Sequence, residues 1–210
     1  MRISDLSRQS GVPVATIKFY LREQLLPPGE PTGRNQAVYS EVHLRRLELI
    51  RVMTAQGRLD LNSVRRLLTG ITDERMPLAD LLETLNAVTT GSDNLMPSDS
   101  HFMTQAHADV DRIVEDAGWQ VRTDGASRDR LAHALAAMRR LGCDCTIDYF
   151  DGYVAAADQL ARRESDLIAP DHVDRAAVIA RSLLLEQAFA AMHGLAREHH
   201  VLRRVGPVPG

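Results

Sequence analysis

The chain has 210 residues, with 25 Lys and Arg against 28 Asp and Glu, so its formal net charge is −3. An apolar fraction of 44% and a charged fraction of 25% exclude a disordered or fibrous protein. The longest apolar stretch, residues 176–196, is interrupted by Arg181 and Glu186, and the N-terminus lacks the apolar run of a signal peptide. We therefore expect a cytoplasmic protein with no membrane partner.

The near-neutral total conceals two segments of opposite charge. Residues 1–70 carry 11 basic and 6 acidic side chains, a net charge of +5. Residues 71–210 carry 14 basic and 22 acidic side chains, a net charge of −8. A basic segment joined to an acidic one indicates a nucleic-acid contact confined to one end of the chain. A domain boundary is expected near residue 70.

The first residues predict two short helices. Ser4 is the expected N-cap of a helix that runs to about Ser10, and Gly11-Val12-Pro13 interrupts it. Residues 14–23 then carry apolar side chains at spacings of three and four, which is helical periodicity. Two helices joined by a short turn that contains glycine predict a helix-turn-helix motif.

A turn-rich segment follows, over residues 25–39. Its three prolines and two glycines exclude a helix, and the alternation over residues 36–39 predicts a small β-hairpin, or wing. Ser40 is expected to cap the next helix, which Gly57 ends. A further helix is expected from Asp60 or Asn62 to about residue 70.

From residue 77 onward the pattern is helical throughout. Helical segments are expected at about 78–88, 101–117, 127–142, 146–167 and 172–200. The expected fold class is mostly α, with an N-terminal winged helix-turn-helix and a small β-hairpin wing, followed by an all-α C-terminal domain.

The second expected helix and the wing carry an ordered motif. Residues 16–20 read Thr-Ile-Lys-Phe-Tyr, Leu25-Leu26 follow, and Arg34 and Tyr39 lie in the wing. This order resembles that of MerR-family transcriptional regulators. The family usually has a glycine before the Leu pair, where this chain has Gln24, and a Tyr-Arg step in the wing, where this chain has Ala37-Val38.

The resemblance implies that residues 1–70 bind DNA. A recognition helix needs short or polar side chains that reach base edges and cations that reach phosphates. Arg45, Arg46 and Arg51 are expected to add contacts to the DNA backbone. Arg45-Arg46 can also be a solvated helix face, and Tyr20 can be a packed aromatic. The expected DNA-binding residues are Thr16, Lys18, Phe19, Tyr20, Arg22, Arg34, Asn35, Tyr39 and Arg45.

The resemblance also implies the mode of action. Members of this family bind a promoter pseudo-palindrome as homodimers and distort it so that RNA polymerase engages both promoter elements. The expected partners are double-stranded promoter DNA, a second copy of the chain, RNA polymerase and a small organic effector, without a cofactor. Residues 71–100 are then a connecting helix and linker, and residues 101–205 an effector-binding and dimerisation domain.

The dimerisation helix is not determined by the pattern. In the family, a long antiparallel helix usually follows the DNA-binding domain directly, but residues 78–88 are short. Residues 172–200, which are apolar on more than one face, are therefore a substitute or an addition. The aromatic residues of the C-terminal part either line an effector cavity or fill the core; they are Phe102, Trp119, Tyr149, Phe150, Tyr153 and Phe189.

Two other interpretations of the C-terminal part stay open. Cys143 and Cys145, with His193, His199 and His200, suit a metal- or thiol-responsive regulator. The single residue between the cysteines is too short a gap for a zinc knuckle, so no metal site is expected, and Cys143 is expected to be buried at a helix end. The other interpretation is an architectural or protein-interaction DNA-binding protein without a small-molecule effector.

An enzyme is not expected. The sequence has no glycine-rich phosphate loop, no Gly-X-Ser-X-Gly elbow and no His-Glu-X-X-His pair. Asp148, Asp151 and Glu164 lie on expected helices, where carboxylates at such spacings are ordinary surface residues.

Overall fold

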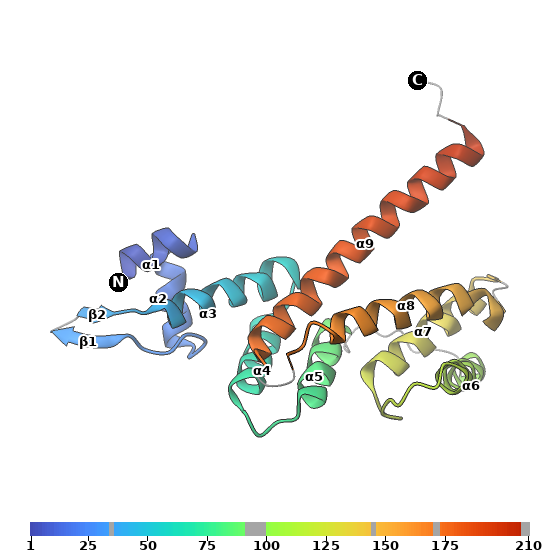
Figure 1. Cartoon of the computed structure of the whole chain (residues 1–210), viewed down its shortest axis with the longest axis horizontal. Coiled ribbons are helices and arrows are strands. Elements are labelled where there is room, and N and C mark those ends of the chain that lie inside the picture. The colour runs from blue at the N-terminus through green and yellow to red at the C-terminus, as the bar shows by residue number, and fades with distance from the viewer. Residues whose placement is uncertain (34–35, 91–99, 144–145, 170–172, 207–210) are drawn as a thin grey trace. The chain divides into compact units, whose positions relative to one another are not determined.

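The structure, a computed structural model, describes residues 1–33, 36–90, 100–143, 146–169 and 173–206. Contacts divide the chain into two compact units: unit 1 comprises Met1–Asp73 and Arg175–Gly210, and unit 2 comprises Glu74–Asp174. In the described residues, the only sheet is a two-stranded hairpin in unit 1, and helices make up most of the rest (Figure 1). The expected fold class, a winged helix-turn-helix followed by an all-α part, is confirmed. No helix in these ranges is long and apolar enough to cross a membrane.

The two units differ more strongly in charge than the two sequence segments do. Unit 1 carries 16 basic and 9 acidic residues, a net charge of +7. Unit 2 carries 9 basic and 19 acidic residues, a net charge of −10. The contrast increases because the final helix, which is basic, belongs to unit 1 by its contacts, whereas the sequence pattern grouped it with residues 101–205.

Unit 1 begins with the helix-turn-helix, α1 (Ile3–Ser10) and α2 (Val14–Arg22). Gly11, at φ +67°, ends α1 in the left-handed conformation that glycine adopts at least cost. The expected N-cap at Ser4 is wrong, because Ser4 lies inside α1. The backbone N–H of Arg2 instead donates to the Asp5 carboxylate at 3.2 Å.

The wing is a short antiparallel hairpin of β1 (Glu30–Gly33) and β2 (Gln36–Val38). It is shorter than the sequence suggests, because Leu25 and Leu26 are buried in the turn after α2 rather than in a strand. The base of the hairpin is tied to the N-terminus: the Tyr39 N–H donates to the Met1 carbonyl at 2.8 Å, and the Met1 amino group to the Tyr39 carbonyl at 2.7 Å. The wing and the start of α1 are therefore held together.

Two further helices complete the N-terminal part of unit 1. Helix α3 (Glu41–Arg51) continues into a π-helical turn, η1 (Val52–Gln56), and α4 (Leu61–Thr72) follows. Of the two expected starts, Asp60 is the N-cap of α4, since its Oδ1 accepts the Ser63 N–H at 2.7 Å. Hydrogen bonds from Ser63, with a smaller contribution from the backbone of Asn62, hold the pKa of the Asp60 carboxyl below its ordinary value.

The long helix α9 (Arg175–Val205) packs on this part of unit 1 through its first turns only. Ile179 and Leu183 are fully or almost fully buried, and Arg175 Nη2 donates to the Gly70 carbonyl at 2.8 Å. Beyond Leu183 the large apolar side chains of α9 are mostly exposed, and the helix projects away from α3 and α4 (Figure 1). The second part of α9 therefore exposes most of its large apolar side chains in a single chain.

Gly57, which follows η1, lies against Leu183 of α9. A Cβ atom at this position would lie 2.7 Å from the Met53 carbonyl oxygen and 3.2 Å from Leu183 Cδ2. We therefore expect Gly57→Ala to lower the free energy of unfolding by about 1–3 kcal/mol, because the backbone must shift and the packing of Leu183 against this position is weakened. Denaturant unfolding followed by circular dichroism measures the loss.

Gly152→Ala is the matched control for Gly57→Ala. A Cβ atom at Gly152, in the first turn of α8, meets nothing within 4 Å, so this substitution should be neutral or stabilise the chain by about 0.5 kcal/mol. Equal unfolding midpoints for the two variants would contradict the packing of Leu183 on Gly57.

Unit 2 consists of α5 (Leu78–Thr90), α6 (Ser100–Asp116), α7 (Ala126–Arg140), the 3₁₀ turn η3 (Ile147–Phe150) and α8 (Asp151–Ser165). Small residues let α6 and α7 approach closely around a core of Ala106, Val110, Ala132, Leu135 and Ala136. Ion pairs of Arg128 with Asp111 and of Arg139 with Asp109 join the same two helices. Helix α5 caps α7, since Glu83 Oε1 accepts the Ala126 N–H at 2.7 Å.

Candidate nucleic-acid interface

A groove of about 720 Å³ lies between α2, the start of α1 and the wing. Lys18 of α2 and Arg2 line its helical side, and Thr32 and Gln36 line its hairpin side; all four residues are exposed. Phosphate contacts in protein–DNA complexes come from Lys and Arg and from polar side chains of this kind. The groove is therefore suited to a segment of sugar-phosphate backbone.

Lys18 has the environment expected of a phosphate-binding cation. It is exposed on α2, and no hydrogen bond or ion pair involves its ammonium group among the described residues. Thr16, two residues earlier, is half-buried and lies in the first turn of α2, the part of a recognition helix that approaches base edges. The structure brings Lys18 to the groove but does not place Thr16 in it.

Arg22 is held on the surface by its neighbours. Its guanidinium carbon lies 5.3 Å from the centre of the Phe19 ring, and its Nε lies 3.8 Å from Glu23 Oε1. The side chain is nonetheless 72% exposed. Exposed ion pairs contribute about 1 kcal/mol or less, so Arg22 can exchange Glu23 for a phosphate at small cost.

Tyr20 and Tyr39 are part of the core. They are 9% and 7% exposed, and the Tyr39 ring meets the His43 ring edge-on at 5.2 Å. For Tyr20 this is the packed alternative that the sequence left open. Contact with DNA through the two hydroxyl groups stays a prediction.

The arginines of α3 have two different roles. Arg45 is 77% exposed with Glu41 at 3.7 Å, so it is available to DNA. Arg46 Nε donates to the Leu25 carbonyl at 2.7 Å, and Arg51 Nη1 to the Ser10 carbonyl at 2.6 Å. These two hydrogen bonds tie α3 to the end of α1 and to the turn after α2, and contacts of Arg46 and Arg51 with the DNA backbone stay a prediction. Burial lowers the pKa of the Arg46 guanidinium.

Arg34 and Asn35, the remaining expected contacts, lie outside the described residues. Conversely, the structure adds Arg2, Thr32 and Gln36, which sequence reasoning missed. Arg2 reaches the groove because Met1 pairs with Tyr39, 38 positions away, and the local sequence has no signal for that pairing.

Gln24 stands where the family usually has a glycine, and the structure shows the backbone conformation that this position requires. Its φ is +59°, the left-handed conformation that favours glycine, and the family usually has a glycine here. A side chain in this conformation costs about 1 kcal/mol. The turn that leads to the buried Leu25 and Leu26 is thus retained with a strained residue.

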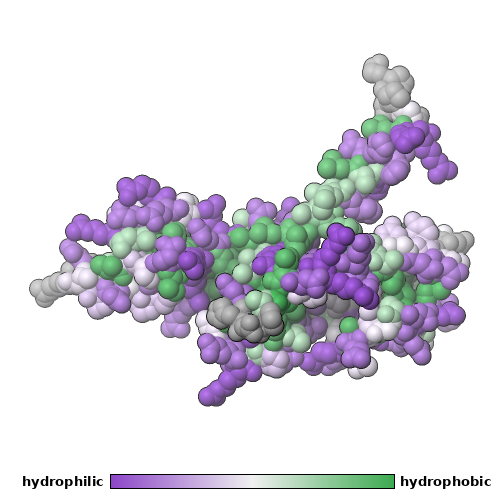
Figure 2. Space-filling model, in the orientation of Figure 1, coloured by the Kyte–Doolittle hydropathy of each residue, from purple (hydrophilic) through white to green (hydrophobic). Residues whose placement is uncertain are grey.

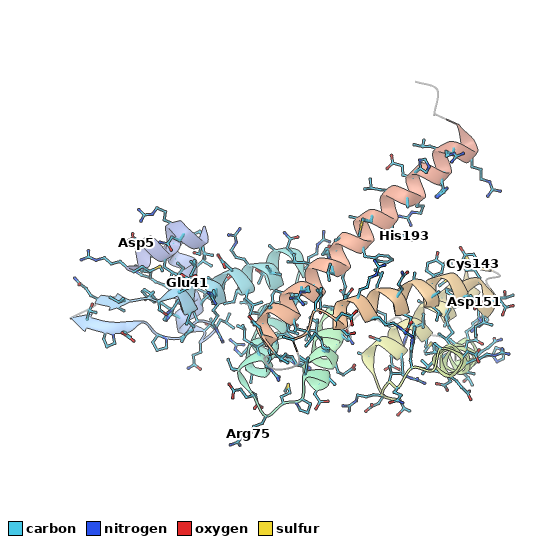
Figure 3. All side chains as sticks on the ribbon, in the orientation of Figure 1. Asp5, Glu41, Arg75, Cys143, Asp151 and His193 are labelled. Atoms are coloured by element: carbon cyan, nitrogen blue, oxygen red, sulfur yellow. The ribbon has the colours of Figure 1, made fainter. Side chains whose placement is uncertain are left out.

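The cysteine and histidine positions do not form a metal site in the part of the chain that the structure describes. No three His, Cys, Asp or Glu side chains there are grouped to hold an ion. Cys143 is exposed, contrary to the expected burial, and Cys145 lies outside the described ranges. His193 stacks on Phe189 along α9, with ring centres 6.1 Å apart (Figure 3).

A helix-turn-helix, a hairpin wing and a cationic groove between them define a winged helix-turn-helix DNA-binding protein. Residues 1–71 match the family described as MerR HTH family regulatory protein. The chain belongs to the MerR family of transcriptional regulators.

Two relatives show how far the similarity extends. An HTH-type transcriptional regulator from Haemophilus influenzae, described as a ZntR homolog, is 40% identical over 50 residues, which are 24% of this chain and 37% of that protein. The crystal structure of SCO5550, a candidate transcriptional regulator from Streptomyces coelicolor A3(2), is similar over 100% of both chains, with a TM-score of 0.73 and 30% identity. The first similarity is confined to a short segment, whereas the second covers both units.

Proposed function

We propose that the chain binds a pseudo-palindromic promoter site as a homodimer, distorts this DNA and thereby acts on RNA polymerase, in response to a small organic effector. The observation that carries the proposal is the groove between α2 and the wing, with Lys18 and Arg2 exposed along it. Such a protein works in the cytoplasm, where promoter DNA and polymerase are found.

A homodimer is proposed because one chain presents one recognition helix. A single helix-turn-helix reads one half-site, so a pseudo-palindrome requires two copies related by a two-fold axis. Two subunits also double the phosphate contacts. The added contacts offset the cost of bending or untwisting a promoter, which is of order 1–6 kcal/mol.

The projecting part of α9 is the surface that we assign to the second copy. Apolar side chains are visible along it in Figure 2, and an isolated helix with such a stripe is marginal in water. Helix α5, the alternative, has its Leu81 and Leu85 fully buried in the single chain, so these two side chains offer no apolar surface to a partner. The exposed apolar residues of α9 are Leu184, Phe189, Met192, Leu195, Val201 and Leu202.

The order of residues on α9 favours an antiparallel pair centred on Leu195. Leu184, Leu195 and Leu202 share one face of the helix, and such a pair places Leu195 opposite its own copy and Leu202 opposite the partner's Ala188. The opposed helix dipoles of the two copies attract each other.

The charge of unit 2 supports a division of roles. With a net charge of −10, this unit is repelled by DNA, while unit 1 at +7 is attracted to it. The repulsion orients the protein so that the groove of unit 1 meets the DNA first.

The proposal is tested by a gel shift with DNA from upstream of the chain's own coding region. We expect a retarded complex with two chains per duplex, and an apparent affinity that falls steeply as salt rises. Fragments with the site at the end or in the middle should differ in mobility, because the protein bends the DNA. A failure to retard any fragment from this locus, even at low salt, would sink the proposal.

A further inference from the structure

Unit 2 contains a cavity of about 390 Å³ that the DNA-binding role leaves unused. It lies where the end of α6 meets the segment that carries Trp119, and η3 and α8 complete its wall. Ile113, Trp119 and Val154 contribute apolar surface. The volume falls in the range of small-molecule sites, which combine an apolar wall with a few polar groups.

The backbone at the end of α6 positions Trp119. Gly118, at φ +67°, ends the helix in a Schellman motif, in which the Trp119 N–H donates to the Val114 carbonyl and the Gly118 N–H to the Glu115 carbonyl, both at 3.0 Å. The indole is held at its other end, since Nε1 donates to Asp158 Oδ1 at 3.0 Å. The ring is therefore anchored at both ends beside the cavity.

Four carboxylates and one cation line the same cavity: Asp116, Asp148, Asp151, Asp158 and Arg112. Asp158 is satisfied by Trp119 and by Arg162 Nε at 2.7 Å. Asp116, Asp148 and Asp151 make no ion pair with any described residue. Asp151 is labelled in Figure 3.

A favourable position in a helix dipole accounts for only two of these three carboxylates. Asp148 and Asp151 lie in the first turns of η3 and α8, where a negative charge suits the helix dipole. Asp116 is the exposed last residue of α6, where the helix dipole disfavours a negative charge. Arg112, four residues earlier on α6, lines the same cavity, but the two side chains form no ion pair in the structure.

We propose that this cavity binds a small organic cation, an amine or quaternary ammonium with an apolar part, held by Asp116 and Asp151 and by the face of Trp119. Carboxylates together with a fixed indole recognise this class of ligand. A bound metal ion is disfavoured, because among the described residues these carboxylates do not converge as metal ligands. The acidic field of unit 2 concentrates cations near the cavity. If the proposed regulator is correct, this ligand is its effector.

The chain contains a single tryptophan, Trp119, so its fluorescence reports on this cavity alone. Three probes share one aromatic ring and differ in charge: benzyltrimethylammonium, benzyl alcohol and benzenesulfonate. We expect a saturable change in emission with the cation, and at least about tenfold weaker binding of the uncharged and anionic probes. Isothermal calorimetry measures the same binding without relying on the fluorophore.

Substitutions separate the cavity from a general attraction to an acidic surface. Asp116→Asn and Asp151→Asn should each weaken binding of the cation about tenfold, and Asp129→Asn, an exposed residue of α7 outside the cavity, should leave it unchanged. Equal effects of all three, equal binding of the three probes, or neither heat nor an emission change with the cation would each overturn the proposal. The test uses no DNA, so its failure is distinct from a failure of the gel shift.

Discussion

A Lys18→Ala, Arg22→Ala double variant is expected to bind promoter DNA about 10³-fold more weakly than the wild-type chain at physiological salt. In a dimer it removes four cations proposed to contact phosphates, and each contact contributes about 0.9 to the slope of log affinity against log salt. The slope should therefore fall by about 3 to 4. Because both side chains are exposed, the thermal unfolding of the chain should not change.

The matched control is an Arg130→Ala, Arg163→Ala double variant, which removes the same charge from exposed positions on α7 and α8. It should bind DNA as tightly as the wild-type chain, or slightly less tightly through the change in net charge. A titration across 50–300 mM salt, read by fluorescence anisotropy of labelled DNA, measures both slopes. If Lys18→Ala, Arg22→Ala retained the wild-type slope, the groove of unit 1 would not be the phosphate site.

A Leu195→Glu variant is expected to be monomeric at concentrations where the wild-type chain is a dimer. Leu195 is 67% exposed in the single chain, so the substitution should not disturb the fold of unit 1. In the antiparallel pair it removes two buried leucines and places two carboxylates against each other, which should raise the dimer dissociation constant by about 10³ or more. Sedimentation equilibrium measures this constant.

Cysteine crosslinking separates the antiparallel pair from other arrangements. In a background of Cys143→Ser and Cys145→Ser, Leu195→Cys should form a covalent dimer on mild oxidation. Ala190→Cys, on the opposite face of α9, should not. A parallel pair would also crosslink Leu184→Cys and Leu202→Cys. A dimer that resists all these substitutions would place the interface elsewhere.

Local patterns predicted the elements of this chain well, because each element has its own signal. Three- and four-residue apolar spacing marked the helices, and the carboxylate of Asp60 marked the start of α4. The motif at residues 16–20 marked the second helix of the helix-turn-helix. The local patterns do not show which surface each apolar face packs against. The apolar stripe of α9 is visible in the sequence, but the contact of its Leu183 with Gly57 joins residues 126 positions apart.

The sites were predicted less completely, for a related reason. Arg45, Arg46 and Arg51 are the same residue type on one helix, and only the position of nearby carbonyl groups decides which of them are bound within the chain. The cavity of unit 2 depends on Trp119 and Asp158, which are 39 positions apart. Asp148 and Asp151 are indistinguishable by sequence from ordinary surface carboxylates.

The return of α9 to unit 1 makes unit 2 an inserted domain. The chain leaves unit 1 after Asp73 and re-enters it at Arg175, and the bond from Arg175 to the Gly70 carbonyl shows that the exit and the entry are neighbours. The inserted segment is thus tethered at two adjacent points, one after α4 and one before the helix assigned to the second copy. A ligand that rigidifies the inserted domain acts on both tethers together. Because both ends of unit 2 join unit 1 outside the groove and α9, evolution can replace the whole of unit 2 without altering the residues of the groove or of α9.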